Sequence, residues 1–250
     1  MTVLLIRANR NDLDKTELEA RGLESIEDPY LSISSVSNPK GAQRLFGVLS
    51  DRSPVWFALT SVNALRYWEL QCPPGAIETL FSQGKNIRFA AVGEQSAEAL
   101  RLKGAAKVHV PALRDGRSLG DLISAYEPSS VVIPQGKLAM KSLQSRLTDS
   151  GFELFEETFY STDPVEKVPR SVELINSAAI AAVVLRSPSA ARVFFRYNPK
   201  PPESLKIVCG GKTTAEQVEK LGYLEFSVAK DPSSSSVAEL ILSLREGEPE

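Results

Sequence analysis

Short apolar runs alternate with amphipathic segments along the chain, and this alternation restricts the possible folds more than any other feature. Most of the runs are rich in Val and Ile and apolar at consecutive positions, which is typical of strands buried on both faces. The amphipathic segments end at a glycine, the usual stop of an α-helix, at Gly22, Gly104, Gly151 and Gly222. Strands that alternate with helices through short links predict an α/β fold with doubly wound parallel sheets. The expected strands are residues 2–7, 55–59, 87–92, 107–110, 130–134, 180–186, 206–209 and 225–229.

An internal repeat supplies four kinds of segment, each present twice. The paired segments are 3–32 with 131–161, 59–65 with 185–191, 91–104 with 209–222, and 118–123 with 236–241. At the ends of the chain, segment 3–32 comes before the other three kinds of segment. In the middle of the chain, its counterpart 131–161 comes after them. The simplest account is a continuous domain, residues 34–162, inserted into a discontinuous domain, residues 1–33 plus 163–250. The expected linkers, near residues 28–38 and 160–168, contain Pro and Ser, as linkers commonly do.

Charge and hydropathy exclude several classes of partner. A net charge of −2 and a pI of about 5.7 disfavour nucleic acid, because domains that bind it usually carry a basic excess. No apolar run approaches the roughly 18 residues of a membrane helix, so no membrane partner is expected. The first residues, MTVLLIRANRND, lack the basic segment and the cleavage site of a signal peptide. Cys72 and Cys209 are too few for a disulfide framework, and we expect a protein of the reducing cytoplasm.

The chain contains one histidine, His109, and this limits its possible chemistry. A metal site built on histidine needs more clustered ligands than the sequence offers, so no metal is expected. A Ser-His-Asp triad would have to use His109, and no Gly-x-Ser-x-Gly turn lies near it. We expect His109 to lie on a short strand.

Two turns share one pattern, in which an apolar strand runs into Ser and small residues and then into a helix. Ser61 lies in LTSVNAL and Ser187 lies in LRSPSAA. In open α/β sheets ligands bind beyond the carboxyl ends of the strands, where unpaired N–H groups and the helix dipole favour anions. We therefore expect anionic groups at the helix starts after Ser61, near Gly93 and Ser96, after Ser187 and at residues 212–214.

An ordered set of motifs resembles the uroporphyrinogen-III synthases, the cofactor-free cyclising enzymes of tetrapyrrole synthesis. The matching stretches cover nearly the whole chain in the family's order: VLLIR, FALTSVNA, AAVGEQSAEALRLKG, VVIPQG, FYST, VVLRSPSAARVF, CGGKTTAEQVEKLG and AKDPSSSSVAELI. The resemblance implies two α/β domains joined by a two-stranded linker, with the site in a cleft between them. It also implies a monomer that needs no cofactor.

The implied substrate is hydroxymethylbilane, a linear tetrapyrrole lined with acetate and propionate groups and handed over by hydroxymethylbilane synthase. The implied reaction removes the terminal hydroxyl as water, inverts the last pyrrole ring and closes the macrocycle to uroporphyrinogen III. Tyr160, in FYST, occupies the family's tyrosine position. Our hypothesis is that its phenol hydrogen-bonds the departing hydroxyl, and the alternative is a tyrosine packed at a domain junction.

Other residues have two interpretations each. Gln135 stands where many members have Arg in Ile-Pro-Arg-Gly, so one cation is missing, although an amide can still donate hydrogen bonds. Thr213 and Thr214 are expected to cap a helix, to contact the ligand, or to do both, and Ser96 has the same choice. Arg7 and Arg186 follow strand ends, where each could neutralise a propionate or pair with a surface acid. In DPSSSSV, Ser236 is the expected cap of the last helix.

Two other classes of function fit parts of the sequence. A non-catalytic, two-domain binding protein for a small polyanion would show the same repeat and the same linkers, although the chain lacks an export signal. A dinucleotide-binding enzyme would need Gly-x-Gly-x-x-Gly after a strand, and neither AAVGEQSA nor IVCGGKTTA supplies it. Isomer analysis after incubation with hydroxymethylbilane distinguishes the cyclising enzyme from both.

Overall fold

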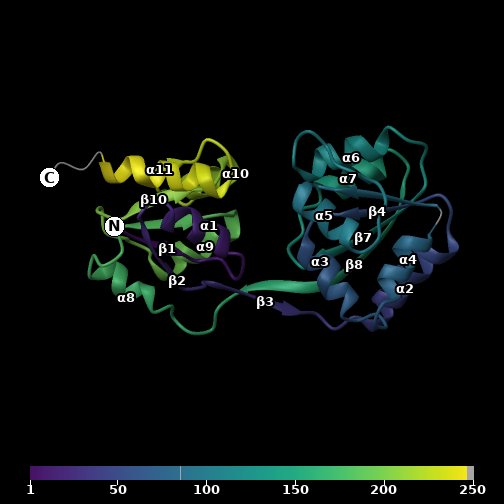
Figure 1. Ribbon diagram of the computed structural model, residues 1–250, viewed down its shortest axis with the longest axis horizontal. Coiled ribbons are helices and arrows are strands. Elements are labelled where there is room, and N and C mark those ends of the chain that lie inside the picture. Colours follow the sequence, from purple (N-terminus) through teal and green to yellow (C-terminus); the bar gives the residue numbers. More distant parts are fainter. Residues whose placement is uncertain (85, 247–250) are drawn as a thin grey trace. The chain divides into compact units, whose positions relative to one another are not determined.

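The computed structural model describes residues 1–84 and 86–246, and the chain forms two compact units. Unit 1 consists of Met1–Ile33 and Asp163–Glu250, and unit 2 consists of Ser34–Thr162. Unit 1 therefore combines the purple N-terminal elements with the green and yellow C-terminal ones (Figure 1).

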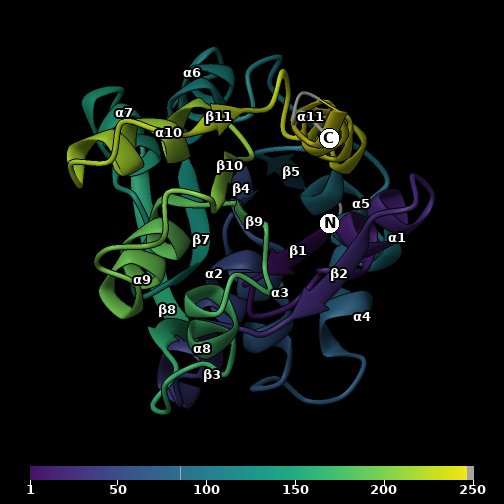
Figure 2. The same cartoon turned by 90° about the vertical axis from the view of Figure 1, so that its left-hand side faces the viewer.

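The sheet of unit 1 has the strand order β11-β10-β9-β1-β2, and every pairing in it is parallel. Figure 2 shows β10, β9, β1 and β2 following one another in that order. The strands are β1 (Thr2–Leu5), β2 (Glu24–Glu27), β9 (Ala182–Leu185), β10 (Lys206–Cys209) and β11 (Ser227–Val228). The helices are α1 (Asp12–Glu19), α8 (Ser171–Asn176), α9 (Pro188–Tyr197), α10 (Lys212–Lys220) and α11 (Ser234–Glu246).

Apolar residues cover both faces of this sheet because successive side chains of a strand point to opposite sides. Val3 and Leu5 of β1 pack with residues of α1 and α11. Leu4 and Ile6 pack with residues of α8, α9 and α10 on the other face. The continuous apolar run of the first strand thus stabilises two separate cores, as a doubly wound fold requires.

The sheet of unit 2 has the strand order β3-β8-β7-β4-β5-β6. Its strands are β3 (Leu31–Ser35), β4 (Val55–Leu59), β5 (Ile87–Ala91), β6 (Val108–His109), β7 (Ser130–Gly136) and β8 (Glu153–Pro164). From β8 to β6 the neighbouring strands are parallel. The helices are α2 (Pro39–Asp51), α3 (Val62–Glu69), α4 (Ala76–Gln83), α5 (Glu94–Leu102), α6 (Gly116–Ser124) and α7 (Ser142–Asp149).

Unit 2 also buries both faces of its sheet. Phe57 and Leu59 of β4 pack with α2, α3, α4 and α5, whereas Trp56 and Ala58 pack with α6 and α7. The segments that repeat in the sequence take the same places in the two sheets. The order β8-β7-β4-β5-β6 of unit 2 matches β2-β1-β9-β10-β11 of unit 1, segment for segment.

The strands β3 and β8 are neighbours, and both cross the boundary between the units. The amide of Val36 donates to the carbonyl of Phe159, and the hydroxyls of Ser34 and Ser161 lie 3.0 Å apart. Residue numbers rise along one strand as they fall along the other, so the two strands run antiparallel. Two antiparallel segments of chain therefore join the units.

The α/β class with two parallel sheets is confirmed, but several strands are shorter than the sequence predicts. The expected strand 107–110 is reduced to Val108–His109, and the expected strand 225–229 is reduced to Ser227–Val228. Both are outermost strands with one neighbour each, so fewer backbone groups find partners in the ladder. Within the described ranges, no helix has the length and apolar character needed to cross a membrane.

Candidate functional site

In each sheet, two neighbouring inner strands lead to helices on opposite faces. In unit 1, β1 leads to α1 on one face and β9 leads to α9 on the other. In unit 2, β7 leads to α7 and β4 leads to α3, again on opposite faces. Ligands of open α/β sheets bind beyond the carboxyl ends of strands at such switch points. We therefore describe the carboxyl edge of each sheet in turn.

At the switch point of unit 2, Ser61 and Tyr160 form a hydrogen-bonded pair. Ser61 is the N-cap residue of α3 and has an extended backbone, yet its side chain makes no capping bond. Its Oγ accepts a hydrogen bond from the Tyr160 hydroxyl at 3.1 Å, and both side chains are half-buried. The structure thus brings together two residues that are 99 positions apart, both predicted to lie at the site.

A second helix start at this edge lacks a side-chain cap. The N-cap of α5 is Gly93, which has an extended backbone and no side chain to offer. Ser96, predicted to contact a ligand, is the third residue of α5 and is buried. The exposed Arg114 packs over Gly93, since a Cβ placed at Gly93 would lie 3.6 Å from its Cδ. Sequence reasoning missed Arg114, because no motif connects this loop residue with the helix start.

Gln135 has different partners from those expected. It lies buried near the end of β7, where its Nε2 donates to Glu156 Oε2 at 3.1 Å. Its Oε1 accepts from Gln144 Nε2 at 2.9 Å. Lys141 also donates to Glu156 Oε2, at 2.7 Å. The amide is therefore engaged within unit 2, where it links β7 to α7 and β8, and contact of Gln135 with a ligand stays a prediction.

At the corresponding turn of unit 1, Ser187 caps its helix. Its Oγ accepts a hydrogen bond from the amide of Ala190 at 3.1 Å and lies 3.0 Å from the hydroxyl of Ser189. Pro188 follows as the first helical residue, where its missing N–H costs nothing. The hydroxyl of Ser187 is therefore committed to α9, although its turn repeats the sequence pattern of Ser61.

Arg186, directly before this turn, forms an ion pair inside unit 1. Its guanidinium donates to both carboxylate oxygens of Asp14, with Nε at 2.9 Å from Oδ2. The Arg186 side chain is 9% exposed and that of Asp14 is 1% exposed, so the partner is a buried acid and not the surface acid considered from the sequence. Ser234, at the start of α11, also donates to Asp14, at 2.6 Å. The pair thus joins α1, β9 and α11.

Arg7 lies at the same edge and makes a single side-chain hydrogen bond within the described residues. Its Nη1 donates to the carbonyl of Arg10 at 3.3 Å, and it makes no ion pair within the described part of the chain. Burial lowers the pKa of Arg7, the charge of Asp14 acts in the opposite direction, and nearby Arg186 lowers the pKa further. A guanidinium offers five donors, so an anion at this edge would find most of them available.

The threonines of α10 lie inside the helix and do not cap it. The N-cap is Gly211, which makes no side-chain bond, and the helix begins at Lys212. Thr213 is exposed and Thr214 is buried, so the expectation of a threonine cap is wrong. Thr214 and Ser96 are both the third residue of their helices. The last helix is also capped differently from the prediction, because the Ser233 hydroxyl accepts from the amide of Ser236.

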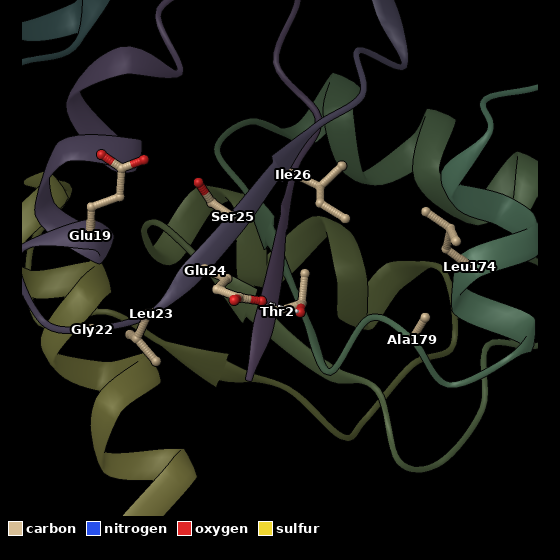
Figure 3. A pocket seen from close by; sticks show the side chains of 9 residues that line it. All are labelled: Thr2, Glu19, Gly22, Leu23, Glu24, Ser25, Ile26, Leu174 and Ala179. Carbon is tan, nitrogen blue, oxygen red and sulfur yellow. Dashed lines mark hydrogen bonds between the residues drawn. The ribbon is translucent and has the colours of Figure 1, made fainter.

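A hollow of about 600 Å³ lies at the outer strand of unit 1, away from these edges (Figure 3). Thr2 and Glu24, the first residues of β1 and β2, line it, so it opens at the amino ends of the strands. Glu19 and Glu24 give it a negative character that would repel carboxylates. We therefore place the candidate site at the carboxyl edges.

His109 lies on β6, as predicted, and packs edge-on against Trp56 and Tyr126. Within the described residues, no group of three or more His, Cys, Asp or Glu side chains is arranged to hold a metal ion.

Comparison with known proteins adds an independent finding. The model of the family described as uroporphyrinogen-III synthase HemD matches residues 13–239. A curated relative, the porphyrin biosynthesis protein HemD of Ruminiclostridium josui, is 24% identical over an alignment of 241 residues that covers 92% of this chain and 46% of the relative. The chain thus spans about half the length of that relative.

Solved structures show the same fold. A mutant uroporphyrinogen III synthase from Thermus thermophilus is 17% identical, with a TM-score of 0.64 and coverage of 98% of this chain and 99% of that one. Uroporphyrinogen-III synthetase from Helicobacter pylori is 18% identical, with a TM-score of 0.64 and the same coverage. At these identities the likeness establishes the two-unit α/β fold.

Proposed function

This chain belongs to the uroporphyrinogen-III synthase HemD family, and on that premise we propose that it converts hydroxymethylbilane into uroporphyrinogen III and water. The observation that carries the proposal is the Tyr160–Ser61 pair at the switch point of unit 2. Membership of this family implies a hydro-lyase that acts on a tetrapyrrole. The paired hydroxyls supply the hydrogen-bonding groups that the loss of a hydroxyl as water requires.

Tyr160 and Ser61 assist the departure of the terminal hydroxyl. Ser61 accepts from Tyr160 through one lone pair, so its own O–H is free to donate to a ligand. A hydrogen bond to the departing oxygen stabilises the negative charge that develops there as the C–O bond breaks. The bilane contributes the rest, because its conjugated pyrrole nitrogen stabilises the cation left behind. General-acid help of this kind is worth about 10²–10⁴ in rate.

The carboxylates of the substrate bind at helix starts that have no side-chain cap. Ser61, Gly93 and Gly211 are the N-cap residues of three such helices, α3, α5 and α10. Each helix start favours an anion by about 0.3–1 kcal/mol when exposed, and by up to about 2 kcal/mol when partly buried. Arg7 and Arg114 add positive charge at the edges of their units. Anion binding by helix starts and a few arginines suits a protein whose net charge is close to zero and whose ligand is a polyanion.

The difficult step is geometric, because the unassisted bilane closes without inverting its last ring. Attack at the substituted carbon of that ring, through a spiro intermediate, requires the two ends of the bilane to be held together. Holding reacting groups in place is worth about 7–11 kcal/mol in favourable cases. We propose that the anchored carboxylates supply this constraint and thereby select isomer III.

Incubation of the purified protein with hydroxymethylbilane tests the proposal. The products are oxidised and separated by chromatography into isomers I and III, with a protein-free sample as the baseline for spontaneous closure. We expect isomer III in excess. Isomer I alone would refute the proposal, and tight binding without turnover, measured by calorimetry, would favour a polyanion-binding protein instead.

The proposal extends to the state and partners of the enzyme. We propose a monomer that works in the cytoplasm without a cofactor and takes its unstable substrate from hydroxymethylbilane synthase. Sedimentation at working concentration measures the oligomeric state. A dimer would contradict this part of the proposal without affecting the assignment of the reaction.

A further inference from the structure

Three contacts hold the ring of Tyr160, and two of them come from residues to which the proposed chemistry gives no role. We propose that Gly136 and Tyr67 are positioning residues, which fix the Tyr160 ring so that its hydroxyl stays on Ser61. This inference rests on the proposed function, because it concerns the same hydroxyl. All four residues belong to unit 2.

Gly136 lies against the face of the Tyr160 ring. A Cβ placed on Gly136 would be 2.5 Å from Tyr160 Cζ and 2.9 Å from both Cε1 and Cε2. The equal distances to the two Cε atoms put this point above the long axis of the ring, near Cζ. The hydroxyl oxygen is not among the three nearest atoms, so the approach is onto the ring face at the carbon that carries the hydroxyl.

The backbone of Gly136 offers no other reason for a glycine. Glycines that need the left-handed region, such as Gly75 and Gly151, have positive φ angles of 74° and 81°, and Gly136 is not among the residues with positive φ. Gly136 is the last residue of β7 and is buried. The close approach of the aromatic ring is therefore the feature that requires a glycine at this position.

The backbone beside the ring is irregular at the same point. Along the parallel pair β7–β8, Gln135 lies opposite Thr158, but Gly136 lies opposite Tyr160, so Phe159 is an extra residue. Such bulges redirect side chains near functional sites. Phe159 and Tyr160 consequently both contact the core on the same side of the sheet, although they are consecutive in the sequence.

Tyr67 supplies an aromatic contact from α3. Its ring is nearly parallel to that of Tyr160, with centroids 5.9 Å apart and an interplanar angle of 22°. Ser61 immediately precedes the same helix and accepts the hydrogen bond from Tyr160. One helix therefore provides both the stacking partner of the ring and the acceptor for its hydroxyl, while β7 provides the space for the ring.

Substitution of Gly136 by Ala separates positioning from packing. The added methyl group would collide with the far end of a side chain, so the ring can move aside and the unit can remain folded. Moving the ring breaks the Ser61 hydrogen bond and displaces the catalytic hydroxyl. Displacing a catalytic group by about 1 Å lowers kcat by about 10²-fold. KM should stay nearly constant, because neither Gly136 nor Tyr67 is needed to bind the carboxylates.

The experiment compares Gly136→Ala with Gly47→Ala, a matched control in α2 where the added Cβ would meet only Asp51 Oδ2, at 4.0 Å. Both substitutions are also made in a Tyr160→Phe background. If Gly136 acts through the Tyr160 hydroxyl, Gly136→Ala costs nothing further once that hydroxyl is gone. Losses that multiply in the double variant would overturn the inference.

Tyr67→Leu and Tyr67→Phe form a second test, which holds even if Gly136→Ala fails to fold. Leu removes the stacked ring and should lower kcat, whereas Phe retains the ring and should restore turnover toward that of the wild type. Equal kcat values for the two variants would overturn the role of Tyr67.

A readout besides activity distinguishes failure of this inference from failure of the proposed function. In protein labelled with ring-¹³C tyrosine, the Tyr160 resonance is identified as the one missing from Tyr160→Phe. It should shift in Gly136→Ala and Tyr67→Leu and stay in place in Gly47→Ala. An unmoved resonance would overturn the inference whatever the activity. A shifted resonance in a protein that makes no isomer III would uphold the positioning and refute only the assigned reaction.

Discussion

The turns at Ser61 and Ser187 share a sequence pattern and a place in the fold, yet their hydroxyls make different bonds. Ser187 accepts from the amide of Ala190 and caps α9, so its hydroxyl serves the helix. Ser61 leaves the start of α3 without a side-chain cap and accepts from Tyr160. The repeat therefore preserves a position beyond the end of a strand, and the neighbours decide whether the hydroxyl caps the helix or accepts from a tyrosine.

The residues beside the two turns also make different kinds of contact. Beside Ser187, Arg186 is tied to the buried Asp14, and this ion pair connects three elements of unit 1. Beside Ser61 stands a half-buried tyrosine whose ring rests on a glycine. Beside its serine turn, unit 1 thus has internal bonds, whereas unit 2 has paired hydroxyl groups. The proposed function accordingly gives the leaving-group chemistry to unit 2, and it gives the anion binding through Arg7 and α10 to unit 1.

The largest expected effect follows from removing the Tyr160 hydroxyl. Tyr160→Phe should lower kcat by about 10²–10⁴ and leave the fold intact, because the ring remains while the hydrogen bond to Ser61, through which the departing hydroxyl is assisted, is lost. Steady-state assay of isomer III measures the effect. Tyr126→Phe, at an exposed tyrosine of the same unit, is the control and should turn over at the wild-type rate. Equal rates for the two variants would remove Tyr160 from the mechanism.

Breaking the ion pair of unit 1 should affect stability and not chemistry. Arg186→Met leaves Asp14 as an uncompensated buried charge, which costs about 3–5 kcal/mol of unfolding free energy. Chemical denaturation followed by circular dichroism measures this loss. The control is Arg192→Met, because Arg192 is exposed and, among the described residues, its side chain bonds only to Gln217. Equal midpoints for the two variants would show that the buried pair does not hold unit 1 together.

Alanine at the two serines tests the comparison directly. Ser187→Ala removes a helix cap and should cost about 0.5–2 kcal/mol of stability. Ser61→Ala removes no cap, so it should cost less stability but lower kcat. Denaturation midpoints and turnover are measured for both variants. The reverse pattern, with the larger stability loss at Ser61, would contradict our distinction between the two turns.

The smallest effect concerns the pH dependence of unit 2. Burial lowers the pKa of His109 below 6.5, and the charges of Lys107 and Arg88 lower it further. Between the folded and unfolded pKa values the unfolded chain binds more protons, so stability is full above the unfolded pKa and falls as pH drops through the folded pKa. His109→Phe should abolish this part of the acid sensitivity. Melting temperatures of both proteins across about pH 5–8 test this, and parallel curves would contradict it.

The sequence permitted a correct prediction of the fold class, but not of the bonding of the candidate site residues. Periodicity placed Ser61, Gly93 and Gly211 just beyond buried strands, because strand ends and helix starts are encoded locally. No local pattern shows that Gln135 is bound to Glu156 and Gln144. Arg114 was missed for the same reason, since its approach to Gly93 joins two loops that are distant in the chain.

The amino-acid sequence alone determines the alternation of strands and helices, the burial of both sheet faces and the repeated turns, because these depend on patterns within a few residues. Only the tertiary structure decides which hydroxyls and charges meet. Tyr160 reaches Ser61 across 99 positions through an extra residue in β8, and Arg186 meets Asp14 across 172 positions. Contacts of this kind depend on strand register and side-chain packing, which a linear sequence does not display.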